Sequence, residues 1–328
     1  MNPQTTKRYD CVGIGLSPYD FTVQVERHPE TNSKNVALRH HGQGGGPVPN
    51  AIAVLARLEC RTALVTTMGD DIYAEQVYQE LDSYGINLKG FRRDGKRRSL
   101  QAHIIVEQDS GNRTVILNSD DLPEIRPDQA PDSLLAETKL VVIDSRPSPG
   151  ILTMAEEAKR HGAEVLMDAG SVQKHTEDAL HLVDYPILSS RFVKDYFGHS
   201  NMERACREIR EFGGTIAGIT MGDEGSYLAN EDAMLYFPAF DIEPVDTTGA
   251  GDVYHGGLMY GILSGWPLKA IGQFASAVAA ICCMHLGVRR HLPDLEEIKE
   301  FMLEHGVEKH PVLQEQIDIF GNADTPDE

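Results

Sequence analysis

The sequence is poor in basic residues. Its 328 residues include 30 lysines and arginines against 50 aspartates and glutamates, which gives a formal net charge of −20. Proteins that bind a nucleic-acid backbone without sequence preference neutralise its phosphates with lysine and arginine. We therefore expect no nucleic-acid partner, although this charge still allows a local basic pocket for one small anion.

Cysteine is scarce, and its spacing is uninformative. The chain has five cysteines, none of them in a C-x-x-C pair. An odd number without paired spacing argues against a disulfide framework and against a zinc site. A reducing compartment is the expectation that follows.

The sequence also lacks long hydrophobic runs. Its longest apolar stretch, residues 274–288, is shorter than the roughly 20 residues that span a bilayer. The first ten residues, MNPQTTKRYD, have no apolar core of the kind found in signal peptides. We expect a cytoplasmic protein with no membrane partner.

The chain does contain a regular alternation of short apolar runs and helical patterns. Buried strands separated by helices indicate an α/β fold with a mostly parallel central sheet flanked by helices. The strand candidates are residues 9–16, 62–67, 140–144, 164–168, 185–188 and 215–220. The helix candidates are residues 50–58, 71–84, 151–161, 201–212, 253–263, 268–286 and 294–303, and a short hairpin is expected after residue 220.

Two segments depart from this alternation. Residues 20–39, and residues 99–107 with 113–118, alternate polar and apolar side chains, which is typical of exposed antiparallel strands. They predict a small antiparallel sheet built from about residues 17–42 and 98–120. This sheet is either an edge extension of the main sheet or a lid over a ligand. Residues 1–310 form the predicted α/β domain, and residues 311–328 form an acidic tail that we expect to be mobile.

The most informative segment is a glycine-rich turn, DTTGAGD, at residues 246–252. Backbone N–H groups at Gly249, Ala250 and Gly251 would lie at the start of a helix, where they can bind an anion. Asp252 would repel a phosphate, but it suits a general base that removes a proton from an attacking hydroxyl. Together these features indicate phosphoryl transfer to an alcohol. The alternative is an ordinary helix start with an acidic residue in its first turn.

The longer stretch DTTGAGDVYHGGL resembles the C-terminal signature of the PfkB/ribokinase family of carbohydrate and nucleoside kinases. The resemblance extends from about Tyr9 to Gly306 and implies a ribokinase-like fold. It implies that Gly249, Ala250 and Gly251 form the anion hole and that Asp252 is the catalytic base. It also implies ATP and Mg²⁺ as cofactors.

Two N-terminal segments extend the resemblance to the acceptor. In VGIGLSPYD, the family places a sugar-binding aspartate at the position of Asp20; the alternative is a turn residue after Pro18. The segment GGGPVPN resembles the family's N-terminal signature and implies that Gly45, Gly46 and Asn50 contact the sugar. It departs from the signature at residues 48 and 49, where Val and Pro stand. A glycine-rich loop before a helix is the plain interpretation.

The nucleotide site is indicated by Thr220, Gly222 and Gly225, which fit the family's T-x-G-x-x-G loop; a β-hairpin turn is the alternative. The family's N-x-x-E motif is missing. Residues 189–192 are SSRF in its place, so Ser189 is the remaining polar candidate there. Asp246 and Thr248 resemble family positions near a monovalent-cation site, which implies K⁺.

The acceptor itself is indicated by the lid pattern and by residues 140–150, which resemble ketohexokinase and the sulfofructose-kinase branch. Arg146 follows a predicted parallel strand, where ligands gather, and its guanidinium suits an anionic or carbonyl group. Its alternative role is to pair with a structural carboxylate. Asn118 on the lid is a further candidate for acceptor binding.

These observations predict an ATP-dependent kinase that phosphorylates a primary hydroxyl of a ketose or a related, anionic sugar. A nucleoside kinase of the same family is the first alternative. Aromatic side chains facing the acceptor base would favour it, and the sequence around Asp20 offers only Tyr19 and Phe21. A binding protein that has lost turnover is the second. The resemblance also implies a homodimer formed through the lid, because exposed alternating strands need a partner or a ligand to cover them.

Overall fold

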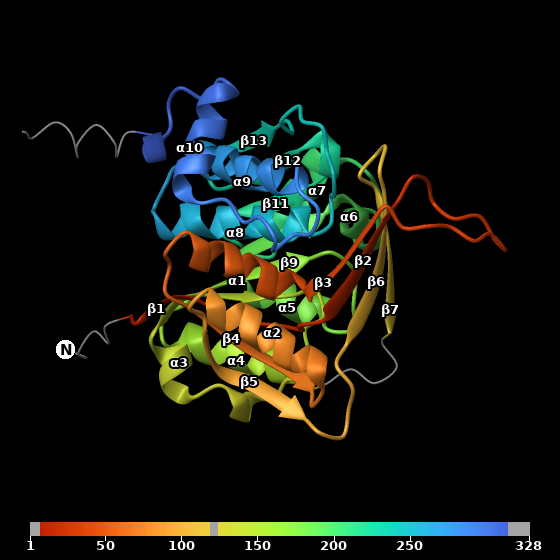
Figure 1. Cartoon of the computed structure of the whole chain (residues 1–328). Coiled ribbons are helices and arrows are strands. Elements are labelled where there is room, and N and C mark those ends of the chain that lie inside the picture. The colour runs from red at the N-terminus through yellow and green to blue at the C-terminus, as the bar shows by residue number, and fades with distance from the viewer. Residues whose placement is uncertain (1–6, 119–123, 314–328) are drawn as a thin grey trace, which may run out of the picture.

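The computed structural model describes residues 7–118 and 124–313. Its centre is a nine-stranded sheet in the order β13-β12-β11-β10-β9-β8-β1-β4-β5 (Figure 1). The seven strands from β11 to β5 are parallel to their neighbours, and β12 and β13 form an antiparallel hairpin at one edge. The strands are β1 (Tyr9–Ile14), β4 (Thr62–Gly69), β5 (Asn87–Asp94), β8 (Thr138–Ile143), β9 (Glu164–Ala169), β10 (Tyr185–Ser189), β11 (Ala217–Thr220), β12 (Ser226–Ala229) and β13 (Met234–Phe237). The predicted α/β class is confirmed.

Helices cover both faces of this sheet, and each layer has its own apolar core. One core joins the sheet to α1 (Pro47–Arg57), α2 (Ile72–Ser83), α8 (Ala250–Leu263), α9 (Leu268–Cys283) and α10 (Leu295–Glu304). The other joins it to α3 (Asp132–Ala136), α4 (Pro149–Arg160), α5 (Thr176–Leu182), α6 (Ser190–Phe197) and α7 (Met202–Arg210). Two short 3₁₀ helices, η1 (Pro127–Gln129) and η2 (Gly222–Glu224), lie in loops. Because both faces are covered, central strands such as β4 are buried along their whole length.

A second sheet stands at one side of the molecule (Figure 1). It has the order β3-β2-β6-β7, from β2 (Tyr19–Val25), β3 (Arg39–Gly44), β6 (Gln101–Glu107) and β7 (Arg113–Asn118). We call it the lid sheet. The expectation of a purely antiparallel sheet is wrong at its centre, because β2 and β6 are parallel. These strands follow β1 and β5, which run the same way in the main sheet, so both leave it in one direction.

Several element boundaries also differ from the prediction. The alternating segment at residues 20–39 is a strand only as far as Val25; residues 26–38 project from the body as a long loop before β3 (Figure 1). Most of the predicted tail, residues 314–328, lies outside the described residues, as do residues 119 and 120 at the end of the predicted lid. Residues 311–313 are helical, and Val312 is fully buried in the first core. In the described part of the chain, no helix is both long and apolar enough to cross a membrane.

Candidate active site

The glycine-rich turn leads into α8 as the sequence predicts. Gly249 is the residue before the helix and has φ 73°, a left-handed conformation that favours glycine. A Cβ at Gly249 would lie 2.6 Å from Cγ2 of Val288. The amide of Ala250 already donates to the carbonyl of Thr247 at 3.3 Å. The next amides, of Gly251 and Asp252, are the first-turn donors that a helix leaves for an anion.

Asp252 lies in the first turn of α8 and accepts a hydrogen bond from Nδ2 of Asn50 at 2.7 Å. Asn50 is buried on α1, so the two signature segments that are 202 residues apart meet at this contact. Burial and the nearby charge of Asp168 raise the pKa of Asp252 to about 6, against the lowering effect of Asn50 and His255. A carboxylate with this pKa is ionised at pH 7 and basic enough to accept a proton.

Asp20 reaches the same place from β2. It is 5% exposed, and its carboxylate lies so close to the backbone of Gly45 that a Cβ there would collide with it. Burial raises the pKa of Asp20 to about 7; Arg289 opposes this shift, and the carboxylates of Asp252 and Glu80 add to it. Asp20, Gly45, Asn50 and Asp252, all predicted from the sequence, therefore form one cluster. Gly46 adjoins it as the residue before α1.

Arg289 is the residue of this cluster that the sequence analysis missed. It is 3% exposed and donates from Nε to Oδ1 of Asn50 and from Nη2 to the carbonyl of Gly45, both at 2.9 Å. Its Nε lies 3.7 Å from Oε1 of Glu80, and its Nη1 has no hydrogen-bond partner among the described residues. The segment that carries it, GVRRH, matches no motif, and its two adjacent arginines are the only signal in the sequence.

Under α8, His255 and Asp168 form a buried pair. Nδ1 of His255 lies 2.8 Å from Oδ2 of Asp168, which stands near the carboxyl end of β9. Burial alone lowers the pKa of His255, but the carboxylates of Asp168 and Asp252 outweigh it and raise that pKa above its usual value. The charge on this ring in turn lowers the pKa of Asp252. Asp168 is the last residue of the predicted strand 164–168, and the sequence patterns did not single out His255.

The lid sheet touches the glycine-rich turn directly. The carbonyl of Gly111, at the β6–β7 turn, accepts hydrogen bonds from the amide of Thr247 at 3.2 Å and from its hydroxyl at 2.9 Å. Arg113, at the start of β7, donates to the same hydroxyl at 3.3 Å. These contacts fasten the β6–β7 turn to the glycine-rich turn and bring a further arginine to the site.

Two further predicted acceptor residues are Arg146, which follows β8, and Asn118, which is the last residue of β7. The backbone amide of Arg146 donates to Oδ1 of the buried Asp144, which follows β8, while Oδ2 accepts from Leu16. The Arg146 guanidinium makes no salt bridge within residues 7–118 and 124–313, so the predicted pairing with a structural carboxylate does not appear there. Asn118 is exposed at the end of β7.

The proposed nucleotide residues are separate from this cluster. Thr220 ends β11 and pairs with Ser226 across the η2 turn, in which Gly222 and Gly225 both have positive φ. This is the hairpin turn that the alternative interpretation described, and it leaves the binding role a prediction. Ser189 is the N-cap of α6. Its hydroxyl accepts a hydrogen bond from the amide of Phe192 at 3.0 Å and donates one to the carbonyl of Gly170 at 3.1 Å.

Of the two residues predicted near a monovalent cation, Asp246 is buried and Thr248 is partly buried. Asp246 accepts from the amides of Thr248 at 2.9 Å and Gly287 at 3.0 Å. The hydroxyl of Thr248 is buried and has no hydrogen-bond partner among the described residues. An orphaned hydroxyl beside a buried carboxylate is a donor set that fits a hard cation such as K⁺.

Comparison with known proteins gives a consistent result. Residues 8–295 match the model of a family described as pfkB family carbohydrate kinase. A nucleoside kinase of Methanothermobacter thermautotrophicus is 27% identical over 310 residues, covering 91% of this chain and 97% of that protein. A ribokinase of Arabidopsis thaliana complexed with ribose and ATP is 20% identical, covers 90% of this chain and 98% of its own, and has a TM-score of 0.75. A putative ribokinase II from E. coli in complex with ATP and Mg²⁺ is 18% identical, covers 90% and 100%, and has a TM-score of 0.79. The ribokinase-like fold is thereby confirmed.

Proposed function

Because the chain belongs to the pfkB family of carbohydrate kinases, we propose that it transfers the γ-phosphate of ATP to a primary hydroxyl of a sugar with Asp252 as general base. The observation that carries the proposal is the contact between Asn50 and Asp252 at the start of α8. It places a carboxylate with a raised pKa beside the free amides of a helix N-terminus.

The reaction that this arrangement supports is an in-line displacement. Asp252 removes the proton from the acceptor hydroxyl as that oxygen bonds to the γ-phosphorus, and the bond from the γ-phosphorus to the bridging oxygen breaks to release ADP. The amide of Gly251 and the helix dipole stabilise the charge on the transferred group. Mg²⁺ enters with ATP as part of the substrate and neutralises its phosphates.

One candidate acceptor is a ketose or a related sugar with an anionic or carbonyl group, in line with the ketohexokinase and sulfofructose-kinase branch. The buried, unpaired Nη1 of Arg289 and the guanidinium of Arg146, which forms no salt bridge among the described residues, would be the donors to such a group. Asp20 and Asn50 would bind the hydroxyl groups, and Gly45 and Gly46 would let the sugar approach the backbone. Asn118 pairs with Gln101 and so lies on the face of the lid sheet opposite to Asp20, which leaves it outside this acceptor site.

A second candidate acceptor is a nucleoside, and one observation favours it. Ala102, Ile104, Val115 and Leu117 lie on the same face of the lid sheet as Asp20, because cross-strand partners share a face. Val115 and Leu117 are 46% and 42% exposed there. An apolar surface beside a sugar-binding carboxylate suits a flat base attached to a ribose, as the likeness to a nucleoside kinase also suggests.

The remaining predicted residues complete the proposal. Thr220, Gly222 and Gly225 would hold the nucleotide, with Ser189 nearby. K⁺ would be held by Asp246 and Thr248, where its charge would strengthen the anion-binding turn that follows. Two copies of the chain would associate through the lid sheet.

The experiment is ADP release by purified protein with ATP and Mg²⁺. The panel contains ketoses, aldoses, sugar acids, sulfonated and phosphorylated sugars, and nucleosides. We expect turnover with one class and a loss of about 10²–10⁴-fold in kcat for Asp252→Asn. An anionic ketose as acceptor predicts a higher KM for Arg146→Met, whereas a nucleoside predicts a higher KM for Leu117→Asp. If ATP binds tightly and no panel member is phosphorylated, the protein is the binding protein without turnover.

A further inference from the structure

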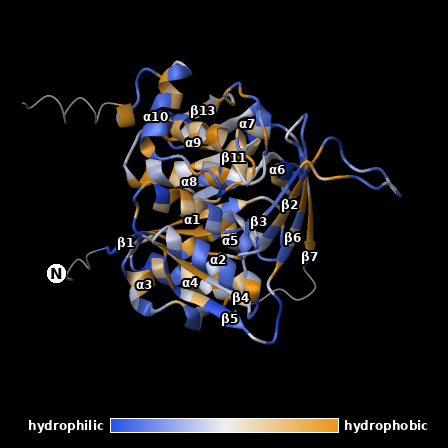
Figure 2. Ribbon diagram, viewed as in Figure 1, coloured by the Kyte–Doolittle hydropathy of each residue, from blue (hydrophilic) through white to orange (hydrophobic). Residues whose placement is uncertain are grey.

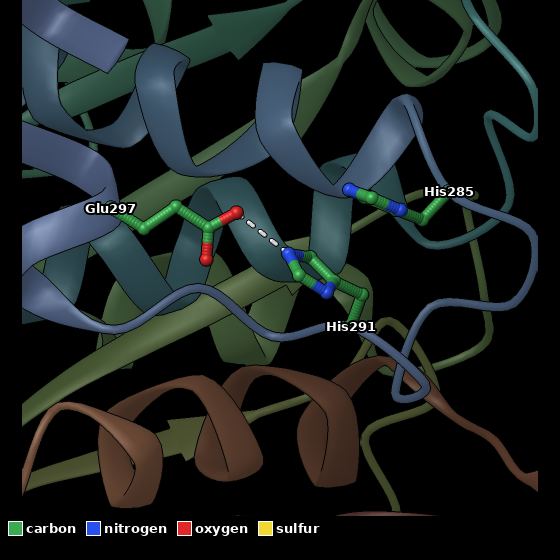
Figure 3. Close-up of side chains that lie close together, drawn as sticks. All are labelled: His285, His291 and Glu297. Atoms are coloured by element: carbon green, nitrogen blue, oxygen red, sulfur yellow. Dashed lines mark hydrogen bonds and ion pairs between the residues drawn. The ribbon is translucent and has the colours of Figure 1, made fainter. Parts of the chain in front are cut away.

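A group of metal-ligating side chains lies outside the acceptor cluster. His285, His291 and Glu297 each offer one ligand atom, and these atoms all lie within 4.8 Å of one another (Figure 3). His285 follows the end of α9, Glu297 is in the first turn of α10, and His291 lies in the segment between these helices. None of the three takes part in the proposed reaction.

The geometry requires only small side-chain movements to hold one ion. Nε2 of His291 lies 2.6 Å from Oε1 of Glu297, and the rings of His285 and His291 are stacked with centroids 3.8 Å apart and planes at 30°. A four-coordinate Zn²⁺ with bonds of about 2.0–2.1 Å holds its ligands about 3.3 Å apart. The closest pair of ligand atoms would move apart, and the more distant ligand atoms would move together around the ion. One imidazole would rotate out of the stack.

The backbone that carries these ligands is held in place without a metal. Asp294 caps α10 by accepting from the amide of Glu297 at 3.1 Å, and the amide of His285 donates to the carbonyl of Cys282 at 3.1 Å. Arg57 binds the carbonyl of Leu292, next to His291, at 3.2 Å and pairs with Asp294 at 2.9 Å. A site on fixed element ends needs only rotamer changes to bind.

Solvent reaches the group. The side chains of His291 and Glu297 are 39% and 37% exposed, and both line a surface cavity of about 460 Å³. Two imidazoles and one carboxylate with an open side form the donor set of a zinc site that keeps a water as its fourth ligand. Such nitrogen donors suit Zn²⁺ or Co²⁺ and do not suit Mg²⁺.

We propose that His285, His291 and Glu297 form a binding site for a divalent transition-metal ion of the Zn²⁺ class, separate from the active site. The earlier expectation against a zinc site rested on the cysteines alone, and the proposed site contains no cysteine. The ion would clamp the segment from residue 285 to 297. That segment carries Arg289, which holds Asn50 and, through it, the proposed base. The metal site stands whether or not the proposed function is correct.

The competing explanation is that Glu297 and His291 form an ordinary ion pair that fastens the segment to α10. It predicts no metal binding beyond that of any other His–Glu pair. The chain offers such a pair as a matched control. Nε2 of His199 lies 2.8 Å from Oε2 of Glu208, and neither residue belongs to a three-ligand group among the described residues.

The test is titration of EDTA-treated full-length protein with Co²⁺, followed by displacement with Zn²⁺. We expect one equivalent to bind, with the visible d–d absorption of four- or five-coordinate Co²⁺. The affinity should fall by at least about 100-fold in His285→Ala and His291→Ala, because loss of even an outer-shell partner costs 10–100-fold. His199→Ala should bind like the wild type.

The outcomes are decisive because a milder variant is available. Glu297→Gln keeps the shape of the side chain and removes its charge, so it serves if a histidine variant does not fold in the absence of metal. Zn²⁺ should raise the unfolding temperature of the wild type and of His199→Ala, and not that of Glu297→Gln. Equal Co²⁺ affinity in all variants, no binding, or a thiolate-to-Co²⁺ charge-transfer band would overturn the proposal.

Discussion

Ionisation of the buried carboxyl group of Asp20 lowers the stability of the folded protein. Its pKa is raised to about 7, mainly by burial, whereas an unfolded aspartate has a pKa near 4. Between these values the folded state holds a proton that the unfolded state has released. The penalty for ionising Asp20 is therefore absent below about pH 4, grows as pH rises, and is complete above about pH 7.

Replacing this carboxylate by an amide should stabilise the protein and weaken acceptor binding. For Asp20→Asn we expect a higher free energy of unfolding than the wild type at pH 8, by up to about 4 kcal/mol for a three-unit shift. The gain should shrink toward pH 5, and the KM for the acceptor should rise. Denaturant unfolding at both pH values measures it, with the exposed Asp232→Asn as control. A variant that is less stable at pH 8 would contradict this account.

The charge on His255 should shift the acid limb of the pH–activity profile. Because Asp252 must be ionised to act as a base and has a pKa of about 6, kcat/KM should rise with pH through this region. The protonated ring of His255 helps to keep that pKa from rising further. In His255→Gln we expect the limb to move to higher pH while the plateau is largely retained.

The control for this shift is His310→Gln. His310 is also a buried histidine, but Nε2 contacts the carbonyl of Ala270 on α9, away from Asp252. Its substitution should leave the pH profile in place. An unmoved limb in His255→Gln, with the protein folded, would show that this ring does not act on the base.

At the scale of elements, two glycines at the start of α8 are needed for different physical reasons. Gly249 needs its positive φ, so Gly249→Ala should lose about 1–2 kcal/mol for the left-handed conformation and more for the contact with Val288. A Cβ at Gly251 meets no described atom within 4 Å. Gly251→Ala should therefore keep the unfolding temperature and lose kcat/KM, because the methyl group obstructs the transferred phosphate. Full activity of Gly251→Ala would argue against close approach of the phosphate at this residue.

The elements that sequence patterns predicted are those with continuous apolar runs. β1, β4, β8 and β9 are buried on both faces, and their hydrophobic stretches are visible in the sequence. β5 was missed because it is an edge strand with charged residues among its apolar ones. α5 and α6 were missed because they are only seven and eight residues long.

The residues of the candidate site also divide into those that the sequence predicted and those that it did not. Residues in motifs, such as Asn50 and Asp252, were predicted and lie together. Arg289 and His255 were missed because what defines them is a partner distant in sequence, 239 residues away for Arg289 and Asn50 and 87 for His255 and Asp168. The parallel pairing of β2 and β6 was missed for a related reason. Alternation shows that a strand has two unlike faces, but it carries no information on the direction of its neighbour.

For the whole molecule, the lid sheet leaves an apolar edge uncovered. β7 is its last strand and pairs only with β6 in the described chain, and all six of its residues are exposed. Figure 2 shows hydrophobic residues along β6 and β7, and Ile116 is 56% exposed on the face opposite to Asp20. An apolar edge strand of this kind is a template for association, which supports a homodimer through the lid.

Sedimentation velocity tests the dimer with a matched pair of lysine substitutions. In a symmetric dimer Ile116 is lost from both subunits, at about 1.5–3 kcal/mol for each buried side chain, so Ile116→Lys should weaken association by more than about 100-fold. Leu303→Lys changes a residue that is 53% exposed on α10, at the far side of the molecule from the lid (Figure 1). We expect the wild type and Leu303→Lys to sediment as dimers and Ile116→Lys as a monomer. A monomeric wild type at working concentration would contradict the proposed dimer.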